Sequence, residues 1–351
     1  MRPDARPAAG LSVVVLGGTG FLGRHLVEGF AALGARVHPV SRTGGVSRAD
    51  GYGPAQSRTA VRLDLLAAAP DEIAGLLDST GADVVVNAAG RAWRADEEQM
   101  AAGNADLVER LVTALAGRPG PPVRLVQLGS VHEYGAGALG AATGEDHPPD
   151  PVTPYGRTKL QGTRAVLRGV SDRGVDGVVL RLANVIGAGV PEGSLFGRVA
   201  AHLGEAARAV ERGEKPAELR LPPLRAARDL VDAGDTVAAV LAAATAPTAA
   251  VTGRVINIGR GEAVPMGELI HRMVTLSGVE VPVVEDAEGP PSRTDVAWQR
   301  LDIGRAERLL GWRPRRSLDD SLREVLAPVL PPGHPLPGTT TDAADMEEES
   351  P

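Results

Sequence analysis

Cysteine is absent from this chain of 351 residues. Its absence excludes a disulfide framework and a cysteine-ligated metal site, and it fits a protein of the reducing cytoplasm. We expect no metal site. Aromatic residues make up only 3% of the chain, which argues against stacking platforms for single-stranded nucleic acid. The formal net charge of −7 argues against a broad basic face, so we expect no nucleic-acid partner.

Long apolar runs are also missing. No stretch of 18 apolar residues occurs, so we expect no membrane span. Residues 1–10 carry charge without an apolar segment, and we expect a disordered N-terminus rather than a secretory signal. Residues 331–351 are rich in proline and then acidic, which predicts a disordered acidic tail. The 43% hydrophobic content predicts that the rest of the chain is globular.

Short apolar runs alternate with helical patterns through the first half of the chain. The run "LSVVVLGG" predicts a buried strand, and "FLGRHLVEGFAALG" after it has apolar residues at helical spacing. Further strands are predicted in "ARVHPV", "VRL" near residue 61, "DVVVNA", "VRLVQLG" and "GVVLRLAN", and long helices in "DEEQMAAGNADLVERLVTALAG" and "PYGRTKLQGTRAVLRGVSD". This alternation predicts an α/β fold with a doubly wound parallel sheet covered on both faces.

The pattern becomes less regular after Asn184. Helices are predicted near 195–212 and in "DAGDTVAAVLAAATA", "PMGELIHRMVTLSG", "DIGRAERLLGW" and "LDDSLREVLAPVL", and a strand in "RVINIG". These elements predict a smaller, discontinuous C-terminal lobe, with a boundary that the chain crosses more than once.

A glycine-rich turn, "GGTGFLG" at residues 17–23, lies between the first predicted strand and the first helix. Gly17 permits a sharp turn, Gly20 lets the backbone approach a pyrophosphate, and Gly23 allows tight packing of the helix. The free N–H groups at the helix N-terminus attract negative charge. Because strand and helix flank the motif, it predicts a dinucleotide site, and the alternative is a plain glycine-rich turn.

The end of the second strand bears on which dinucleotide is bound. A carboxylate there would accept the ribose hydroxyls of NAD, but this chain has Ser41 and Arg42, and no acidic residue until Asp50. Since a guanidinium matches a phosphate in charge and shape, Arg42 predicts a preference for NADP(H). The alternative is that Arg42 is a solvated loop charge and that the cofactor is NAD(H). Asp64 follows the third strand. It either contacts the adenine amino group of the cofactor or serves as the N-cap of a helix.

These signals suggest a division of the chain. We expect residues 11–186 to form the NAD(P)-binding domain, with returning elements at about 228–260. Residues 187–330 are expected to contribute mainly a substrate-binding lobe.

Three polar residues form a candidate catalytic set. Tyr155 and Lys159 in "YGRTK" lie four positions apart, on one face of a predicted helix, where alone they would be ordinary surface residues. Ser130 ends the fifth predicted strand, at the carboxyl edge where ligands bind in parallel sheets, and alone it would be a turn residue. Together with the dinucleotide site at the same edge, they form one candidate set.

The order of the motifs resembles the short-chain dehydrogenase/reductase superfamily, in its extended branch of nucleotide-sugar epimerases, dehydratases and reductases. The resemblance covers about residues 11 to 328 and implies a Rossmann-type fold. Its motifs are "GGTGFLG", "NAAG" at 87–90, Asn104, Ser130, "YGRTK", "RLANVIG", "RDLVDAGDTVAA" and "LGWRP".

The resemblance implies a role for each matching residue. Tyr155 would exchange the proton, Lys159 would hold the nicotinamide ribose and lower the pKa of Tyr155, and Ser130 would hydrogen-bond the substrate oxygen. The implied cofactor-binding residues are Gly17, Gly20, Phe21, Leu22, Gly23, Ser41, Arg42, Asp64, Leu65, Asn87, Ala88, Ala89, Asn104, Tyr155 and Lys159.

The chain departs from the dehydratases of the family at the two positions after Ser130. Those enzymes carry Asp and Glu there, whereas this chain has Val131 and His132, so dehydration by the usual arrangement is not expected. His132 is either an acid or a packing and specificity residue, and the roles of Glu133 and His147 are similarly open.

The resemblance also implies a substrate site made by Asn184, Arg228 and Arg293. The two arginines would clamp a diphosphate. The alternatives are that Arg228 pairs with Asp229 or Asp232 and that Arg293 is a surface charge.

Within the family, the chain looks most like 4-ketoreductases of deoxysugar pathways, which make activated sugars for natural products such as antibiotics. The leading hypothesis is therefore NADPH-dependent reduction of the 4-keto group of a dTDP-4-keto-6-deoxyhexose, with a nucleotide-diphosphate sugar as substrate. The alternatives are an NAD-dependent nucleotide-sugar 4-epimerase and a non-catalytic NADP-binding sensor or scaffold. Relatives also imply a homodimer.

Overall fold

The computed structural model describes residues 8–44, 46–47, 58–92, 95–286 and 296–337. Its centre is a seven-stranded sheet in the order β13-β8-β7-β6-β1-β2-β5, in which every neighbouring pair is parallel. The strands are β1 (Ser12–Leu16), β2 (Arg36–Ser41), β5 (Val61–Arg62), β6 (Val84–Asn87), β7 (Arg124–Ser130), β8 (Gly177–Leu182) and β13 (Val255–Ile258). The predicted α/β class and doubly wound sheet are confirmed.

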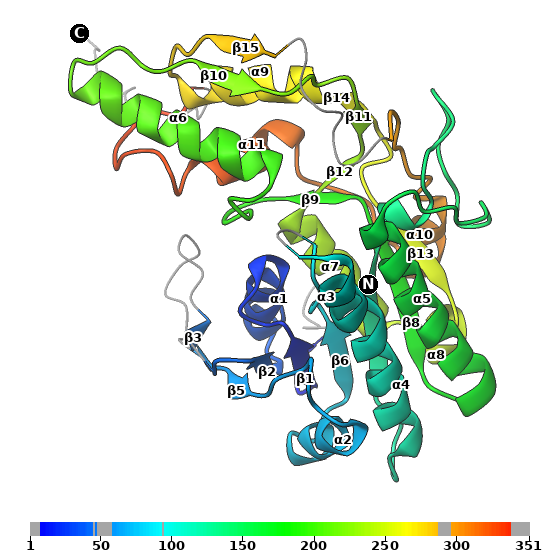
Figure 1. Cartoon of the computed structure of the whole chain (residues 1–351). Helices are drawn as coiled ribbons and strands as arrows, with labels where there is room; N and C mark the ends of the chain where they lie inside the picture. The colour runs from blue at the N-terminus through cyan, green and yellow to red at the C-terminus, as the bar shows by residue number, and fades with distance from the viewer. Residues whose placement is uncertain (1–7, 45, 48–57, 93–94, 287–295, 338–351) are drawn as a thin grey trace, which may run out of the picture.

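Helices cover both faces of this sheet (Figure 1). Alternate residues of β1 divide between the faces, because Val13 and Val15 enter one apolar core while Val14 and Leu16 enter the other. The first core is completed by α1 (Phe21–Ala32), α7 (Ala233–Thr245), α8 (Thr248–Val251) and α10 (Gly304–Leu310), and the second by α2 (Pro70–Ser79), α4 (Leu107–Gly117) and α5 (Pro154–Arg173).

The helix predicted over residues 96–117 contains an interruption. It consists of α3 (Glu97–Ala101), a π-helical turn η1 (Ala102–Asp106) and α4. Asn104 lies in the π-helical turn, and its carbonyl oxygen would be 2.4 Å from a Cβ added at Gly162 of α5. Such turns often mark functional sites, and the apolar periodicity did not predict this one.

The strand predicted in "GVVLRLAN" also divides. β8 ends at Leu182, and β9 (Asn184–Ile186) leaves the large sheet to pair in parallel with β12 (Leu230–Asp232). An apolar run continues across the break, so local pattern could not locate it.

Most of the other described elements gather at one end of the molecule, away from α2 (Figure 1). Three helices pack around a separate apolar core that draws on residues between Ile186 and Leu330. They are α6 (Leu195–Glu211), α9 (Met266–Ser277) and α11 (Leu318–Leu326). The accompanying strand pairs are β10 (Leu219–Leu221) with β15 (Val283–Glu285) and β11 (Ala227–Arg228) with β14 (Val264–Pro265). Near β2, β3 (Val46–Ser47) pairs with β4 (Arg58–Thr59).

Both ends of the described chain extend into segments expected to be disordered. Ala8 is fully buried in the core beside α1, so residues 8–10 belong to the folded part. At the other end, Leu336 packs on the core of α6, α9 and α11, and the imidazole of His334 is 2.7 Å from the carbonyl oxygen of Ser277. The expectation was therefore wrong for residues 8–10 and 331–337, because apolar contacts hold them. The rest of the two segments lies outside the described residues.

Among the helices that the structure describes, none has the length and apolar content to cross a membrane.

Candidate active site

The glycine-rich turn joins β1 to α1, and two of its glycines, Gly17 and Gly23, have no room for a side chain. Gly17 has a φ of +76°, and a Cβ added there would lie 2.9 Å from the backbone of Ala89. A Cβ on Gly23 would lie 2.0 Å from the carbonyl oxygen of Gly17. Gly20 is the N-cap of α1 and has no side chain to cap the N–H groups of the first turn, which contains Phe21 and Leu22. The backbone can therefore present these N–H groups to a phosphate.

The segment after β6 lies against this turn. Asn87 is buried and is fixed by its own amide, which donates to Gln127 Oε1 at 2.9 Å and accepts from the N–H of Ala89 at 3.2 Å. The N–H of Ala88 donates to the carbonyl of Leu16 at 3.0 Å. The connections from β1 and β6 run to opposite sides of the sheet, so these residues lie at its switch point, where such folds bind dinucleotides.

Asn104 is buried close to this segment but faces protein groups. Its side chain accepts from the N–H of Arg91 at 2.9 Å and donates to the carbonyl of Arg91 at 2.8 Å. It also donates to Thr158 of α5 at 3.1 Å. The structure thus makes Asn104 a link between the chain after β6 and α5.

The end of β2 borders an open hollow lined by Arg42, Thr43, Arg62, Leu63 and Asp64. Parallel pairing sets Ser41 opposite Arg62, so a second guanidinium joins Arg42 at this hollow. Sequence reasoning missed Arg62. The signal was its position at the end of the strand that pairs with β2.

Asp64 and Leu65 are only partly available to a ligand. The carboxylate of Asp64 accepts from the N–H of Leu66 at 3.1 Å, which makes a local turn rather than the N-cap of α2. The side chain of Leu65 is in the core, and its carbonyl accepts from Arg110 at 2.9 Å.

The candidate catalytic residues meet where β7 ends and α5 begins. Thr153 caps α5 by accepting from the N–H of Gly156 at 3.0 Å, and this fixes the first turn, where Tyr155 lies. A Cβ on Gly156 would be 2.3 Å from the carbonyl oxygen of His132, so the helix start touches the turn η2 (Val131–Glu133) after Ser130. The side chains of Ser130 and Tyr155 are hydrogen-bonded.

Burial dominates the pKa values of this corner. It raises the pKa of Tyr155, with the Ser130 hydrogen bond lowering it and the charge of Glu133 raising it. Burial lowers the pKa of Lys159, whose Nζ donates to the carbonyl of Leu128, and Glu133 opposes that change. The net direction of the pKa of Tyr155 is upward, because burial outweighs the hydrogen bond from Ser130; the lowering expected from the charge of Lys159 stays a prediction.

His132, whose role the sequence left open, lies against Tyr155. The two ring centroids are 5.6 Å apart, with the planes at 73°. Burial and the charge of Arg228 lower the pKa of His132 to about 4, while a hydrogen bond with Asn184 opposes this. The imidazole is therefore neutral near pH 7, and it connects Tyr155 with two of the candidate substrate-binding residues.

Asn184 lies on β9, which pairs with β12, and Arg228 ends β11, which pairs with β14; both act on this imidazole. Asn184 donates to the carbonyl of Asp229 at 2.9 Å. Arg228 is buried, and burial lowers the pKa of its guanidinium to about 10. Arg293 lies outside the described residues.

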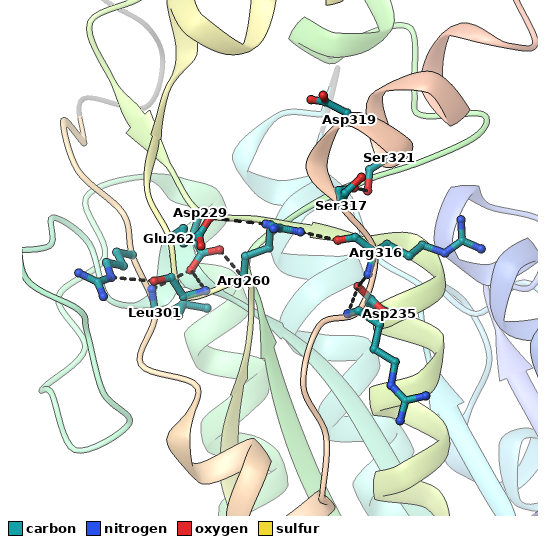
Figure 2. A network of polar contacts seen from close by, with 12 residues as sticks. Asp229, Asp235, Arg260, Glu262, Leu301, Arg316, Ser317, Asp319 and Ser321 are labelled. Atoms are coloured by element: carbon teal, nitrogen blue, oxygen red, sulfur yellow. Dashed lines mark hydrogen bonds and ion pairs between the residues drawn. The ribbon is translucent and has the colours of Figure 1, made fainter. Parts of the chain in front are cut away.

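The acidic residues suggested as partners of Arg228 are engaged elsewhere. The Asp229 carboxylate, shown in Figure 2 with Arg260 and Leu301, accepts from the N–H groups of Arg260, Gly261 and Leu301 at 2.8, 3.1 and 2.9 Å. Asp232 caps α7 and lies 3.5 Å from the guanidinium of Arg316. Because Asp229 joins three separate segments, it fixes the strand that carries Arg228.

Comparison with known proteins gives results consistent with this geometry. Residues 13–259 match the NAD dependent epimerase/dehydratase family. The dTDP-6-deoxy-L-talose 4-dehydrogenase (NAD(P)(+)) of Kitasatospora kifunensis is 43% identical over 327 residues, which are 92% of this chain and 96% of that protein.

Solved structures share the fold. MoeE5 in complex with UDP-glucuronic acid and NAD is 26% identical, with a TM-score of 0.71, over 90% of this chain and 98% of that one. RMD from Pseudomonas aeruginosa, complexed with NADPH, is 24% identical, with a TM-score of 0.73, over 91% and 98% of the two chains.

Proposed function

Because this chain belongs to the NAD dependent epimerase/dehydratase family, we propose that it is an NAD(P)-dependent oxidoreductase acting at C4 of a dTDP-6-deoxyhexose. The observation that carries the proposal is the 43% identity, over 92% of this chain, to a dehydrogenase whose name specifies that position and that type of substrate. We further propose that the working direction is reduction of the 4-keto group by NADPH, in the synthesis of an activated deoxysugar.

The residues present fit a dinucleotide. Added Cβ atoms at Gly17 and Gly23 would clash with the backbone of Ala89 and of Gly17, so glycine is needed for the close turn that leads to the N-terminus of α1. The backbone of Asn87, Ala88 and Ala89 would form the other wall. When bound, the cofactor supplies the hydride that reduces C4, or accepts it in the reverse reaction.

Two arginines support a preference for NADP(H). Arg42 and Arg62 line one hollow at the end of β2, and Ser41 stands where a carboxylate would accept ribose hydroxyls. A guanidinium pair suits the 2′-phosphate, and the carboxylate of Asp64, which lines the same hollow, accepts from the N–H of Leu66. Binding of NAD(H) is also compatible with this site. The relative from Kitasatospora kifunensis is named for both cofactors, as NAD(P)(+).

We assign proton transfer to Tyr155. In reduction its hydroxyl gives a proton to the C4 oxygen as the hydride arrives at the carbon, so the carbonyl becomes a hydroxyl and the phenolate is reprotonated from solvent. Ser130, hydrogen-bonded to Tyr155, would donate to the same substrate oxygen and align it. Lys159 would hold the nicotinamide ribose and stabilise the transient phenolate.

Substrate binding is assigned to the side opposite the cofactor cradle. Asn184 and Arg228 adjoin His132, which contacts Tyr155, so a sugar held by these groups would be next to the phenol. Arg228 would bind the diphosphate, and Arg293 is proposed as its partner in that role.

The direct test is a panel of dTDP-4-keto-6-deoxyhexoses assayed by the loss of NADPH absorbance. Turnover of one or more of them supports the proposal. An inactive panel, together with purified protein that retains stoichiometric NAD(H) and interconverts C4 epimers of a nucleotide sugar, would support a 4-epimerase. Binding of NADPH without turnover of any nucleotide sugar would support a sensor or scaffold.

A further inference from the structure

Glu133 is fully buried three residues after Ser130, and the catalytic assignments above do not use it. Its Oε1 accepts from the N–H of Ser130 at 2.8 Å. Its Oε2 accepts from Thr163 Oγ1 at 2.8 Å and from Arg181 Nε at 2.7 Å. A buried carboxylate is costly unless it is paired and hydrogen-bonded, and each oxygen of this one is satisfied.

The three partners belong to three different elements. Ser130 ends β7, Thr163 lies on α5, and Arg181 lies on β8. Thr163 follows Lys159 by four residues and Tyr155 by eight, so all three occupy one face of α5. The carboxylate therefore ties the end of β7 to the helix face that carries the proton donor.

The same corner contains several charged and titratable groups. Lys159 and Tyr155 face it from α5, and the Arg181 guanidinium lies 4.4 Å from the ring centroid of Tyr134. Glu133 raises the pKa of both Tyr155 and Lys159.

More distant polar groups surround the side chain of Tyr134. Its hydroxyl donates to Asn257 at 2.8 Å, and His147 meets its ring edge at 6.1 Å between centroids. Glu145, which accepts from the N–H of Asn257, raises the pKa of Tyr134, and His132 contacts Tyr155 from the other side. Of the acidic residues described here, Glu133 is the one that accepts hydrogen bonds from Ser130 and from Thr163 on the helix of Tyr155.

We propose that Glu133 is a positioning residue, which holds Ser130 and the Tyr155 face of α5 at a fixed separation and keeps the phenol protonated for donation to the ketone. The inference rests on the proposed function, because it concerns the proton that Tyr155 gives. It also predicts that oxidation is fastest at a higher pH than reduction, since a neighbouring anion disfavours the phenolate that oxidation would require as a base.

The central test is Glu133→Gln. A glutamine offers one acceptor oxygen to three donors, so Ser130 or the Thr163–Arg181 pair loses its partner. We expect kcat to fall by about tenfold or more, which is the loss of about one charge-assisted hydrogen bond. We also expect the alkaline limb of kcat/KM for reduction to move to lower pH, because the phenol loses a neighbouring negative charge.

Thr163→Val is the matched control. It removes one hydrogen bond from the same carboxylate but leaves the charge in place. Its rate should fall less, and its alkaline limb should stay at the wild-type pH. If the limb moves as far in Thr163→Val as in Glu133→Gln, the proposed electrostatic role is wrong.

Glu133→Gln leaves Arg181 as a buried charge without its carboxylate, which threatens folding. The double variant Glu133→Gln/Arg181→Met removes both charges and keeps a similar volume. It should fold and bind NADPH, and its alkaline limb should still lie at lower pH than that of the wild type, by less than in Glu133→Gln because the positive charge of Arg181 is also removed. Restoration of the wild-type limb in this double variant would contradict the inference.

A measurement without substrate separates this inference from the proposed function. The chain has 3 tyrosines, so NMR of protein with isotope-labelled tyrosine Cζ resolves each one, and Tyr155→Phe assigns the Tyr155 signal. In the NADP⁺ complex, Tyr155 should titrate at lower pH in Glu133→Gln than in the wild type. This shift in a protein that turns over no keto-sugar would retain the inference and reject the function. Unchanged titration in both Glu133→Gln and the double variant would reject the inference even in an active enzyme.

Discussion

The two ends of the candidate site differ in how they hold charge. At the end of β2, Arg42, Arg62 and Asp64 are exposed around an open hollow. At the end of β7, Glu133, Lys159 and Arg181 are buried, and Glu133 bonds to Arg181 and two other donors. Exposed charges are screened by water and recognise a phosphate by geometry, whereas buried charges alter the pKa of their neighbours. The first end is suited to selecting a cofactor and the second to tuning a proton donor.

The largest expected effect is at the buried end. Tyr155→Phe should lower kcat by about 10²–10⁴-fold, the range for removal of a general acid, while the Kd for NADPH stays within about twofold. Steady-state kinetics and a fluorescence titration of NADPH measure the two quantities. Tyr134→Phe, which removes the other described phenol of this region, should keep most of the turnover. Equal losses in both variants would show that packing rather than proton transfer is responsible.

The next effect is at the exposed end. Arg42→Ala/Arg62→Ala should weaken NADPH binding by about tenfold or more and leave NADH binding nearly unchanged, because only NADPH carries the 2′-phosphate. Each single variant should show part of the loss, and added salt should reduce the difference. Arg36→Ala, at the start of β2 and away from the hollow, is the control. A similar loss for both cofactors would contradict this division of roles.

A smaller effect is expected where the substrate side meets the phenol. His132→Gln removes the ring that lies against Tyr155 and should lower kcat/KM by about three- to tenfold, the range for one neutral hydrogen bond. Because the pKa of His132 is lowered to about 4, the imidazole is neutral above that pH in the wild type as well. The pH profile near neutrality should therefore keep its shape. Loss of a kinetic pKa near neutrality in this variant would mean that His132 is an acid after all.

The last effect concerns stability rather than turnover. Burial raises the pKa of Asp229 from 3.8 to about 6, so the folded protein binds this proton more tightly than the unfolded chain does. The contribution of Asp229 should therefore become less favourable as pH rises from about 4 to about 6, by roughly 1–3 kcal/mol. Denaturant unfolding of the wild type and Asp229→Asn over this range measures it. A stability difference between the two proteins that does not change with pH would contradict the expectation.

Local sequence determined the parts of this protein that depend on near neighbours. Strands and helices followed from apolar periodicity, and the turn at Gly17 followed from a backbone that excludes a Cβ. The helix of Tyr155 and Lys159 followed from Thr153, Pro154 and a periodic apolar face. Each of these features depends on residues close together in the sequence, so one sequence is enough to predict them.

Tertiary structure alone decided which distant side chains share a buried space. Glu133 looked like any residue of a loop until β8 and α5 enclosed it with Arg181 and Thr163. Arg62 joined Arg42 through strand register, and Asn184 began a new strand because β12 was there to pair with it. Burial and pairing of this kind depend on contacts between residues far apart in sequence, and these contacts change pKa values and strand boundaries without leaving a local pattern.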